Sequence, residues 1–270
     1  MSTSNPQPTE QQPEPESAQP KRQRPIIAID GPAGAGKSTL AAHLARRFGF
    51  LNLETGAMYR ALALKAIEND VGFDEESPLL DLAALTHISL EPQLEGNRVL
   101  LDGLDVSRRI RDADVTSGAS QISVHPRLRA WMVDAQRVLG RLGGVVMEGR
   151  DIGTAVFPDA EVKIFLDAAP EVRGNRRYRQ HSGDSGRSKP EQERPTQPAS
   201  ATSEAELQRL VAEMRDRDQR DRTRAESPLK AAADAIILDS TALTLDEVLA
   251  QAEQIVRSHL PEPAAPKETA

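Results

Sequence analysis

The sequence predicts an α/β fold in which a doubly wound, five-stranded parallel sheet carries helices on both faces. Two observations lead to this prediction. Short apolar runs bounded by glycine, proline or aspartate indicate buried parallel strands, and helical patterns lie between them. Ligands of such a sheet bind beyond the carboxyl ends of its strands. The expected strands are Ile26–Asp30, Phe50–Leu53, Val145–Glu148, Val162–Asp167 and Ala235–Asp239.

Apolar spacing indicates the main helices. Lys37–Phe48 repeats its large apolar residues four positions apart and ends at Gly49, while Leu128–Leu142 and Leu207–Arg224 are longer examples. Residues 87–105 interrupt the alternation with short strand patterns and turns at Glu95-Gly96-Asn97 and Asp102-Gly103. We therefore expect a small antiparallel insert there, as a candidate substrate-side module.

Composition indicates which parts of the chain form the folded domain and which form tails. Residues 1–24, rich in proline and glutamine, predict a disordered tail whose KRQR cluster is solvated, and residues 260–270 predict a second tail. Residues 181–203 have the same polar character and precede a helix expected at about 204–224. The folded domain is then expected to span residues 25–259.

Charge and residue usage exclude several classes of protein. A net charge of -7 argues against a general nucleic-acid binder. The chain has no cysteine, hence no disulfide, and no apolar stretch of membrane-spanning length. We expect a cytoplasmic enzyme with no membrane partner, and nothing in the sequence demands more than a monomer.

The stretch GPAGAGKST carries the strongest chemical signal. It matches the pattern G-x-x-x-x-G-K-[ST] between an expected strand and an expected helix. Backbone N–H groups in such a loop cradle phosphates, the lysine adds a charge, and the serine hydroxyl suits Mg²⁺. An accidental glycine-rich turn is the alternative, and it would arise in roughly one chain of this length in a hundred. The predicted nucleoside triphosphate site comprises Gly31, Pro32, Ala33, Gly34, Ala35, Gly36, Lys37, Ser38 and Thr39.

A kinase also needs a second anionic site that faces this loop, and two arginine motifs lie where strands end. In ETGAMYR, Thr55 and Gly56 fit a helix N-cap, and Arg60 lies farther along that helix. In EGRD, Arg150 suits a two-pronged bond to phosphate, and Asp151 is an acceptor for an amino group. The alternatives are a surface arginine in the first motif and a local Arg150–Asp151 ion pair in the second.

A third arginine motif, MRDRDQRDRTR, changes the character of a helix face. The apolar stripe of the helix continues onto Arg217, Asp221 and Arg224. A solvated helix with an i,i+4 pair between Arg217 and Asp221 is the alternative. Charged side chains that project over a bound phosphate would explain why this face changes from apolar to charged. We therefore expect a lid that closes over a phosphoryl-transfer site. A guanine-specific GTPase would be expected to carry the motif N-K-x-D. The chain has no Asn-Lys pair, so this class is disfavoured.

Taken in order, six segments resemble the bacterial cytidylate kinases, a family of P-loop nucleoside monophosphate kinases. The segments are IAIDGPAGAGKST, ETGAMYR, ASQISVHPRLR, EGRDIGTAVFPDAEVKIFLDA, RDRDQRDRTRAESPL and IILDST, and the resemblance covers about residues 25–258. It implies transfer of a phosphoryl group from ATP to CMP or dCMP with Mg²⁺, which is bound at Ser38. It also implies that residues 181–203 are an expansion beside the lid.

The resemblance assigns roles to single residues. It implies that Lys37, Arg150 and Arg224 are catalytic and that Arg173 lies near the adenine of ATP. The CMP site would comprise Thr55, Arg60, Ser120, Arg129, Arg150, Asp151, Arg217 and Asp221. Within that site, Ser120, Arg129 and Asp151 would bind the cytosine ring. From the residues alone, Ser120 would be a helix cap and Arg129 a surface charge.

Two other functions stay open from the sequence. The first is a P-loop kinase for another acceptor, such as AMP, UMP or a small metabolite. The second is a nucleotide-binding regulator that has lost transfer activity. The intact Lys37, Ser38 and arginine set weighs against the regulator.

Overall fold

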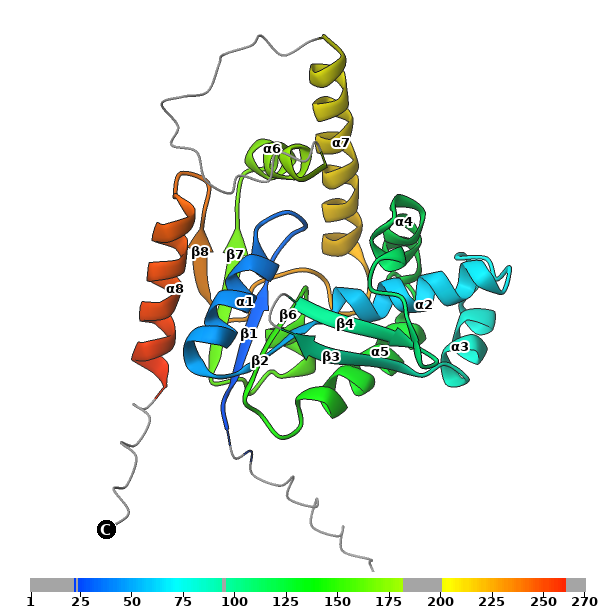
Figure 1. The fold of residues 1–270 in the computed structure, drawn as a ribbon, viewed down its shortest axis with the longest axis horizontal. Coiled ribbons are helices and arrows are strands. Elements are labelled where there is room, and N and C mark those ends of the chain that lie inside the picture. The colour runs from blue at the N-terminus through cyan, green and yellow to red at the C-terminus, as the bar shows by residue number, and fades with distance from the viewer. Residues whose placement is uncertain (1–21, 23, 94–95, 182–200, 261–270) are drawn as a thin grey trace, which may run out of the picture.

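A computed structural model describes residue 22 and residues 24–93, 96–181 and 201–260. Its main sheet has five strands, all parallel, in the order β2-β6-β1-β7-β8 (Figure 1). The strands are β1 Ile26–Asp30, β2 Leu51–Glu54, β6 Val145–Gly149, β7 Val162–Asp167 and β8 Ile236–Asp239. The predicted fold class is confirmed, and each expected strand end lies within one residue of the observed one.

Helices cover both faces of this sheet, as β1 shows. Its residues alternate between two cores, because successive side chains of a strand point to opposite faces. Ile27 and Ile29 pack against α1 and α8, whereas Ile26 and Ala28 join the core beneath α2, α4 and α5. These helices are α1 Lys37–Phe48, α2 Gly56–Glu68, α4 Ala113–Ile122, α5 Pro126–Gly140 and α8 Leu245–His259. In the described part of the chain, no helix has the length and apolar character needed to cross a membrane.

The helix expected at Leu128–Leu142 starts and ends two residues earlier, at Pro126 and Gly140. Proline suits the first helical position because its missing N–H has no intrahelical acceptor there. The apolar periodicity begins only at Leu128, so it could not locate this start.

The small antiparallel insert is present beside β2. It contains β3 Ile88–Gln93, β4 Gly96–Leu101 and β5 Leu104–Asp105, preceded by α3 Glu76–Ala84 and followed by the 3-10 turn η1 Arg109–Arg111. Asp102 and Gly103, between β4 and β5, have φ angles of 51° and 85°. A tight hairpin turn of this kind needs positive φ at both central positions, which agrees with the predicted turn.

Two helices stand over the carboxyl end of the sheet. They are α6 Pro170–His181 and α7 Ala201–Thr223, and they pack closely, since a Cβ on Gly174 would lie 2.3 Å from a methyl group of Val211. We call α7 the lid helix; it begins three residues before the expected start at about 204. Residues 182–200 of the predicted expansion lie outside the described residues.

The prediction of a solvated KRQR cluster is wrong for Arg22, whose side chain is only 15% exposed, whereas Arg24 is exposed but also contacts the domain. Arg22 donates hydrogen bonds to the Asp159 carboxylate at 3.0 Å and to the Asp159 carbonyl at 2.6 Å. Arg24 donates to the carbonyl of Gly49 at 2.7 Å, and its guanidinium lies 5.0 Å from the centre of the Phe50 ring. Sequence reasoning missed these contacts because their partners are distant in the chain.

Replacing Arg22 with alanine is therefore expected to lower the free energy of unfolding by about 1 kcal/mol, because it removes charge-assisted bonds that the folded state alone makes. Urea unfolding measures this. The matched control is Arg209→Ala, because Arg209 is 81% exposed and, among the described residues, pairs only with Glu213 one helical turn away. Such a pair contributes less than about 0.5 kcal/mol. Equal losses in the two variants would contradict a stabilising role for the Arg22 contacts.

Candidate active site

The phosphate loop follows β1 directly and leads into α1. Gly31, Gly34 and Gly36 all have positive φ angles, of 149°, 75° and 101°. A Cβ on Gly31 would lie 2.0 Å from the carbonyl oxygen of Leu166, so only glycine fits there. Lys37, Ser38 and Thr39 form the start of α1, whose first turn has no side-chain cap. The loop and helix N-terminus thus present free backbone N–H groups, as an anion site requires.

Lys37 lies inside this loop. Its Nζ donates to the carbonyl of Pro32 at 2.7 Å, and its side chain is buried. Burial, together with the nearby charge of Arg150, lowers the pKa of Lys37 to about 7. A bound polyanion would reverse this effect, because an opposite charge favours the protonated amine.

Glu148, at the end of β6, lies next to the loop. The hydroxyl of Ser38 lies near its carboxylate, and its Oε1 is buried and has no partner among the described residues. Burial and the neighbouring Glu54 raise the pKa of Glu148 to about 7. A buried carboxylate oxygen without a donor is available to a ligand or to bound water.

Asp30 fixes the EGRD segment against the phosphate loop. Its two carboxylate oxygens accept hydrogen bonds from the backbone N–H groups of Ile152 and Gly153, at 2.8 and 2.7 Å. These residues begin the π-helical turn η2 Ile152–Val156 that follows Arg150 and Asp151. Burial raises the pKa of Asp30 to about 6, although these two hydrogen bonds act to lower it. Sequence reasoning missed Asp30, although a charged residue at the end of an apolar strand was a visible signal.

The alternative of a local ion pair between Arg150 and Asp151 is wrong. Arg150 Nε instead donates to Asp221 of the lid helix at 2.9 Å, and Asp151 pairs with Arg129 of α5. The side chains of Arg129 and Asp151 are 2% and 7% exposed. Adjacent residues thus face different partners, because the chain turns sharply between β6 and η2. This turn directs Arg150 toward the lid helix and Asp151 into the protein interior.

Ser120 and Arg129 are neither a cap nor a surface charge, so the reading of these residues alone is wrong. Both are buried, on α4 and α5. Arg129 also donates to the carbonyl of Ser123 at 3.1 Å and lies 5.7 Å from the centre of the Tyr59 ring. The Ser120 hydroxyl and Arg129 Nε have no partner among the described residues. Both unpaired groups are hydrogen-bond donors available to a polar ring, and Arg129 also contacts the Asp151 carboxylate.

The lid helix turns its charged stripe inward, as predicted. Met214, Asp218, Asp221 and Arg224 are all buried. The alternative of a solvated helix with an Arg217–Asp221 pair is wrong, because Asp221 pairs with Arg150 and lies 3.5 Å from Arg224. Burial alone would raise the pKa of Asp221, but the surrounding arginines bring it below its usual value.

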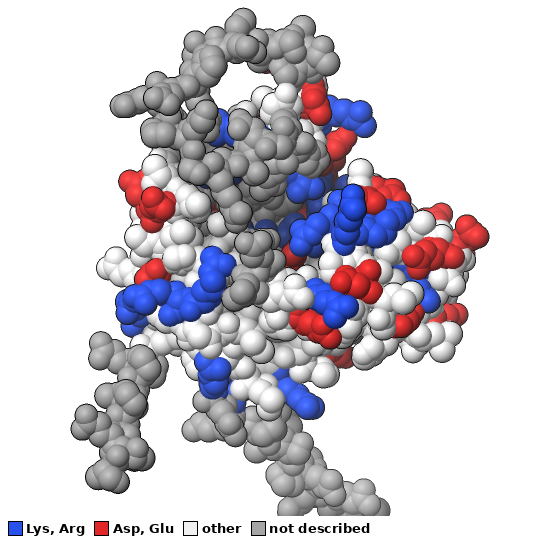
Figure 2. Space-filling view, viewed as in Figure 1, with Lys and Arg blue, Asp and Glu red and all other residues white. Residues whose placement is uncertain are grey.

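Arg217 forms no ion pair with another described residue. Its Nε is buried without a hydrogen bond among the described residues. Burial, followed by repulsion from Arg150, lowers the pKa of Arg217 to about 10, and Arg60 and Arg177 add to the repulsion. Cations that repel one another in a partly buried site are stabilised when an anion binds between them. Figure 2 shows basic side chains gathered on this face, below the lid helix and beside the insert.

Arg60 and Thr55 lie at the start of α2. Arg60 pairs with Glu54, and both side chains are mostly buried, so the surface alternative is wrong. Thr55 is the N-cap residue of α2, as predicted, but its hydroxyl does not make the capping bond. It donates to the carbonyl of Glu148 at 2.7 Å, because Thr55 already has helical backbone angles and its side chain faces β6. Thr55 thereby joins the ends of β2 and β6.

The sequence was also compared with models of known protein families. The model of the family described as cytidylate kinase matches residues 27–258. The chain belongs to the cytidylate kinase family. A cytidylate kinase of Aeromonas salmonicida is 46% identical over 84% of this chain and 91% of its own length. Those of Solibacter usitatus and Vibrio cholerae are 46% and 41% identical, over 90% and 87% of this chain and 97% of their own lengths.

Arg173 connects the two halves of the site in this cytidylate kinase. Its guanidinium donates to the carbonyls of Ala168 and Ala33, both at 2.9 Å, and pairs with Asp218 of the lid helix at 2.6 Å. Ala33 belongs to the phosphate loop, so one buried side chain ties that loop to the lid. Sequence reasoning missed Asp218, since the expected stripe passed through Arg217.

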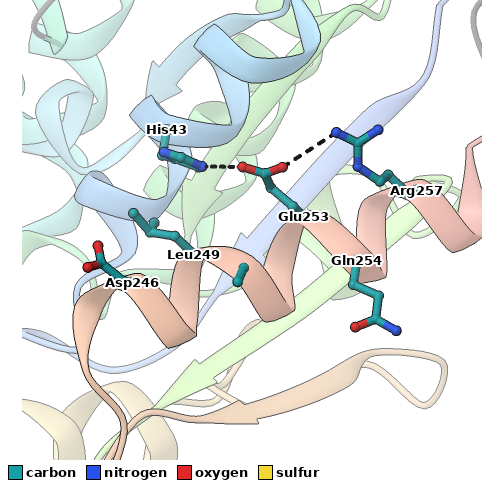
Figure 3. A pocket seen from close by; sticks show the side chains of 7 residues that line it. His43, Asp246, Leu249, Glu253, Gln254 and Arg257 are labelled. Atoms are coloured by element: carbon teal, nitrogen blue, oxygen red, sulfur yellow. Dashed lines mark hydrogen bonds and ion pairs between the residues drawn. The ribbon is translucent and has the colours of Figure 1, made fainter.

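A groove of about 400 Å³ lies elsewhere on the cytidylate kinase, between α1 and α8 (Figure 3). Its lining includes His43, whose Nε2 lies 2.7 Å from Glu253, and Arg257. None of the predicted site residues lines it. The predicted site residues therefore lie in the loop and lid region and not in this groove.

Proposed function

We propose that this chain transfers the γ-phosphoryl group of ATP to CMP or dCMP, which gives ADP and CDP or dCDP. One observation carries the proposal. Arg150, beside the phosphate loop, is held by Asp221 of the lid helix, while the adjacent Asp151 is held by Arg129 in a separate buried polar site. The acceptor phosphate and the acceptor base thus have neighbouring sites at the end of β6.

The donor site is the phosphate loop. Its N–H groups and Lys37 bind the β and γ phosphates of ATP, and Arg173 supports the loop from the side of the adenine. Mg²⁺ fits the oxygen donors present, because the Ser38 hydroxyl and the Glu148 carboxylate offer the one or two protein ligands that this ion usually accepts. Bound there, Mg²⁺ would neutralise charge on the phosphates.

The acceptor site uses the arginines around the cleft. Arg60 and Arg150 bind the CMP phosphate, and Arg224, directly after the lid helix, joins them. Arg217 and Asp221 contact the sugar, and Thr55 holds the start of α2 in place. Phosphoryl transfer needs positioned cations more than a strong base, because charge spreads over the passing group. Lys37 and Arg150 supply that charge next to each other.

Cytosine recognition falls to the buried polar site. Cytosine presents an amino donor and a ring-nitrogen acceptor, whereas uracil presents the opposite pattern. Asp151 accepts from the amino group, and Ser120 and Arg129 donate to the ring. A site built to bond one group discriminates strongly against an analogue that lacks it. The family and its substrates favour a cytoplasmic enzyme that acts as a monomer.

The deciding experiment is steady-state ADP release from ATP and Mg²⁺ with CMP, dCMP, UMP, AMP and GMP as acceptors. We expect CMP and dCMP to exceed the others in kcat/KM by at least about a hundredfold, because the buried polar groups stay unpaired with other bases. Turnover on another acceptor would retain the kinase and discard the base-binding roles. Absence of turnover on every acceptor would favour the nucleotide-binding regulator.

A further inference from the structure

Asn97, at the start of β4, joins the insert to the main sheet through its side chain. Its Nδ2 donates to the carbonyl of Asn52 at 2.7 Å, and its Oδ1 accepts from the N–H of Glu54 at 2.9 Å. The residue is buried, with 7% of its surface exposed. Both of its partners are backbone groups of β2, the outermost strand of the five-stranded sheet.

These two hydrogen bonds have the same pattern as those between neighbouring strands in a parallel β-sheet. In such a ladder, a residue donates to the carbonyl of one residue and accepts from the N–H of the residue two positions later. Asn97 makes these two bonds with its amide, so one side chain replaces a neighbouring strand at the free edge of β2. The arrangement needs one donor and one acceptor on a short side chain, which an amide supplies and a carboxylate does not.

By fixing the backbone of β2, Asn97 also positions a charged side chain in the cleft. The N–H that Asn97 accepts from belongs to Glu54, whose carboxylate pairs with Arg60 and lies 3.9 Å from Arg111. The carboxylate of Glu54 also keeps Arg60 in place when no acceptor is bound. The position of the Glu54 backbone therefore sets where the Arg60 guanidinium lies.

We infer that Asn97 is a positioning residue for binding of the acceptor phosphate, acting through Glu54 on Arg60. This inference rests on the proposed function, in which Arg60 binds the phosphate of CMP. Asn97 makes no hydrogen bond to the phosphate loop. Its loss should therefore change acceptor binding and leave the donor site intact.

The test compares Asn97→Asp with a matched control in the same insert. The aspartate has nearly the same shape but turns the donor that faces the Asn52 carbonyl into a second acceptor. The control is Ser107→Ala, because the Ser107 hydroxyl accepts from the N–H of Val99 at 2.8 Å and so stabilises β4 without touching β2. KM for CMP, KM for ATP, kcat and the thermal midpoint are measured for both variants.

We expect Asn97→Asp to raise KM for CMP by about tenfold, because a displaced Arg60 would lose one charge-assisted hydrogen bond to the CMP phosphate. The kcat value and KM for ATP should stay within about twofold of the wild type. Ser107→Ala should lower the thermal midpoint without changing KM for CMP. In an Arg60→Ala background, Asn97→Asp should have no further effect on KM for CMP, because the two residues act in one chain of contacts.

Three outcomes would overturn the inference. They are an unchanged KM for CMP in Asn97→Asp, equal increases in KM for CMP and ATP, and an equal increase in the Ser107→Ala control. If Asn97→Asp does not fold, Asn97→Ala takes its place, since alanine removes both bonds without adding a charge and the same outcomes apply. A wild-type enzyme without turnover on CMP would instead contradict the proposed function.

Discussion

Replacing Arg150 with alanine is expected to lower kcat with CMP by about a hundredfold to a thousandfold, the usual effect of removing one preorganised donor to a developing negative charge. Arg150 lies beside the phosphate loop, and its charge contributes to the lowered pKa of Lys37. Lys37 alone cannot replace it, because a single ammonium does not offer two parallel N–H donors to the passing phosphate. Coupled measurement of ADP release gives kcat directly.

Two comparisons make this result specific. Arg150→Lys keeps the charge but loses the planar fork, so its kcat should lie between those of the wild type and the alanine variant. Arg150→Ala also leaves Asp221 without its closest cation, although Arg224 remains 3.5 Å away. A thermal midpoint close to that of the wild type therefore has to accompany the loss of activity. Unchanged kcat in Arg150→Ala would refute the catalytic role.

Replacing Asp151 with asparagine is expected to remove the preference for CMP over UMP. The carboxylate accepts from two cationic or amino groups, whereas an amide offers one acceptor and one unwanted donor. We expect kcat/KM for CMP to fall by at least about a hundredfold, kcat/KM for UMP to change far less, and KM for ATP to stay within about twofold. Initial rates with CMP, UMP and ATP as the varied substrates provide the comparison.

This substitution also breaks a buried ion pair, so stability has to be controlled. Removing one partner of such a pair costs about 3–5 kcal/mol when a buried charge is left alone, and Arg129 is 2% exposed. Asp218→Asn is the matched control, because it neutralises another buried carboxylate, the partner of Arg173. The control should lower stability without changing the ratio of CMP to UMP efficiency. An equal fall of both efficiencies in Asp151→Asn would make Asp151 an organiser of the turn.

The elements that the sequence located depend on short stretches of chain. β1, the phosphate loop and α1 follow from an apolar run, three glycines and a helical repeat, and each signal is complete within about ten residues. The inward turn of charge on the lid helix also follows from local spacing, and Asp221 and Arg224 are buried as expected. Helix starts were less certain, as Pro126 shows, because apolar periodicity reports the core and not the cap.

Tertiary structure decided which charges meet. The sequence by itself determined the sheet, the loop and the family resemblance, and it named Arg150 and Asp151 as candidates. It kept a local ion pair between these neighbours as an alternative, whereas the fold pairs Arg150 with Asp221, 71 positions away in the chain, and Asp151 with Arg129, 22 positions away. The roles of Asn97 and Arg22 were hidden in the same way. A hydrogen bond or ion pair depends on distance in space, and local pattern constrains that distance only within a helix turn or a strand.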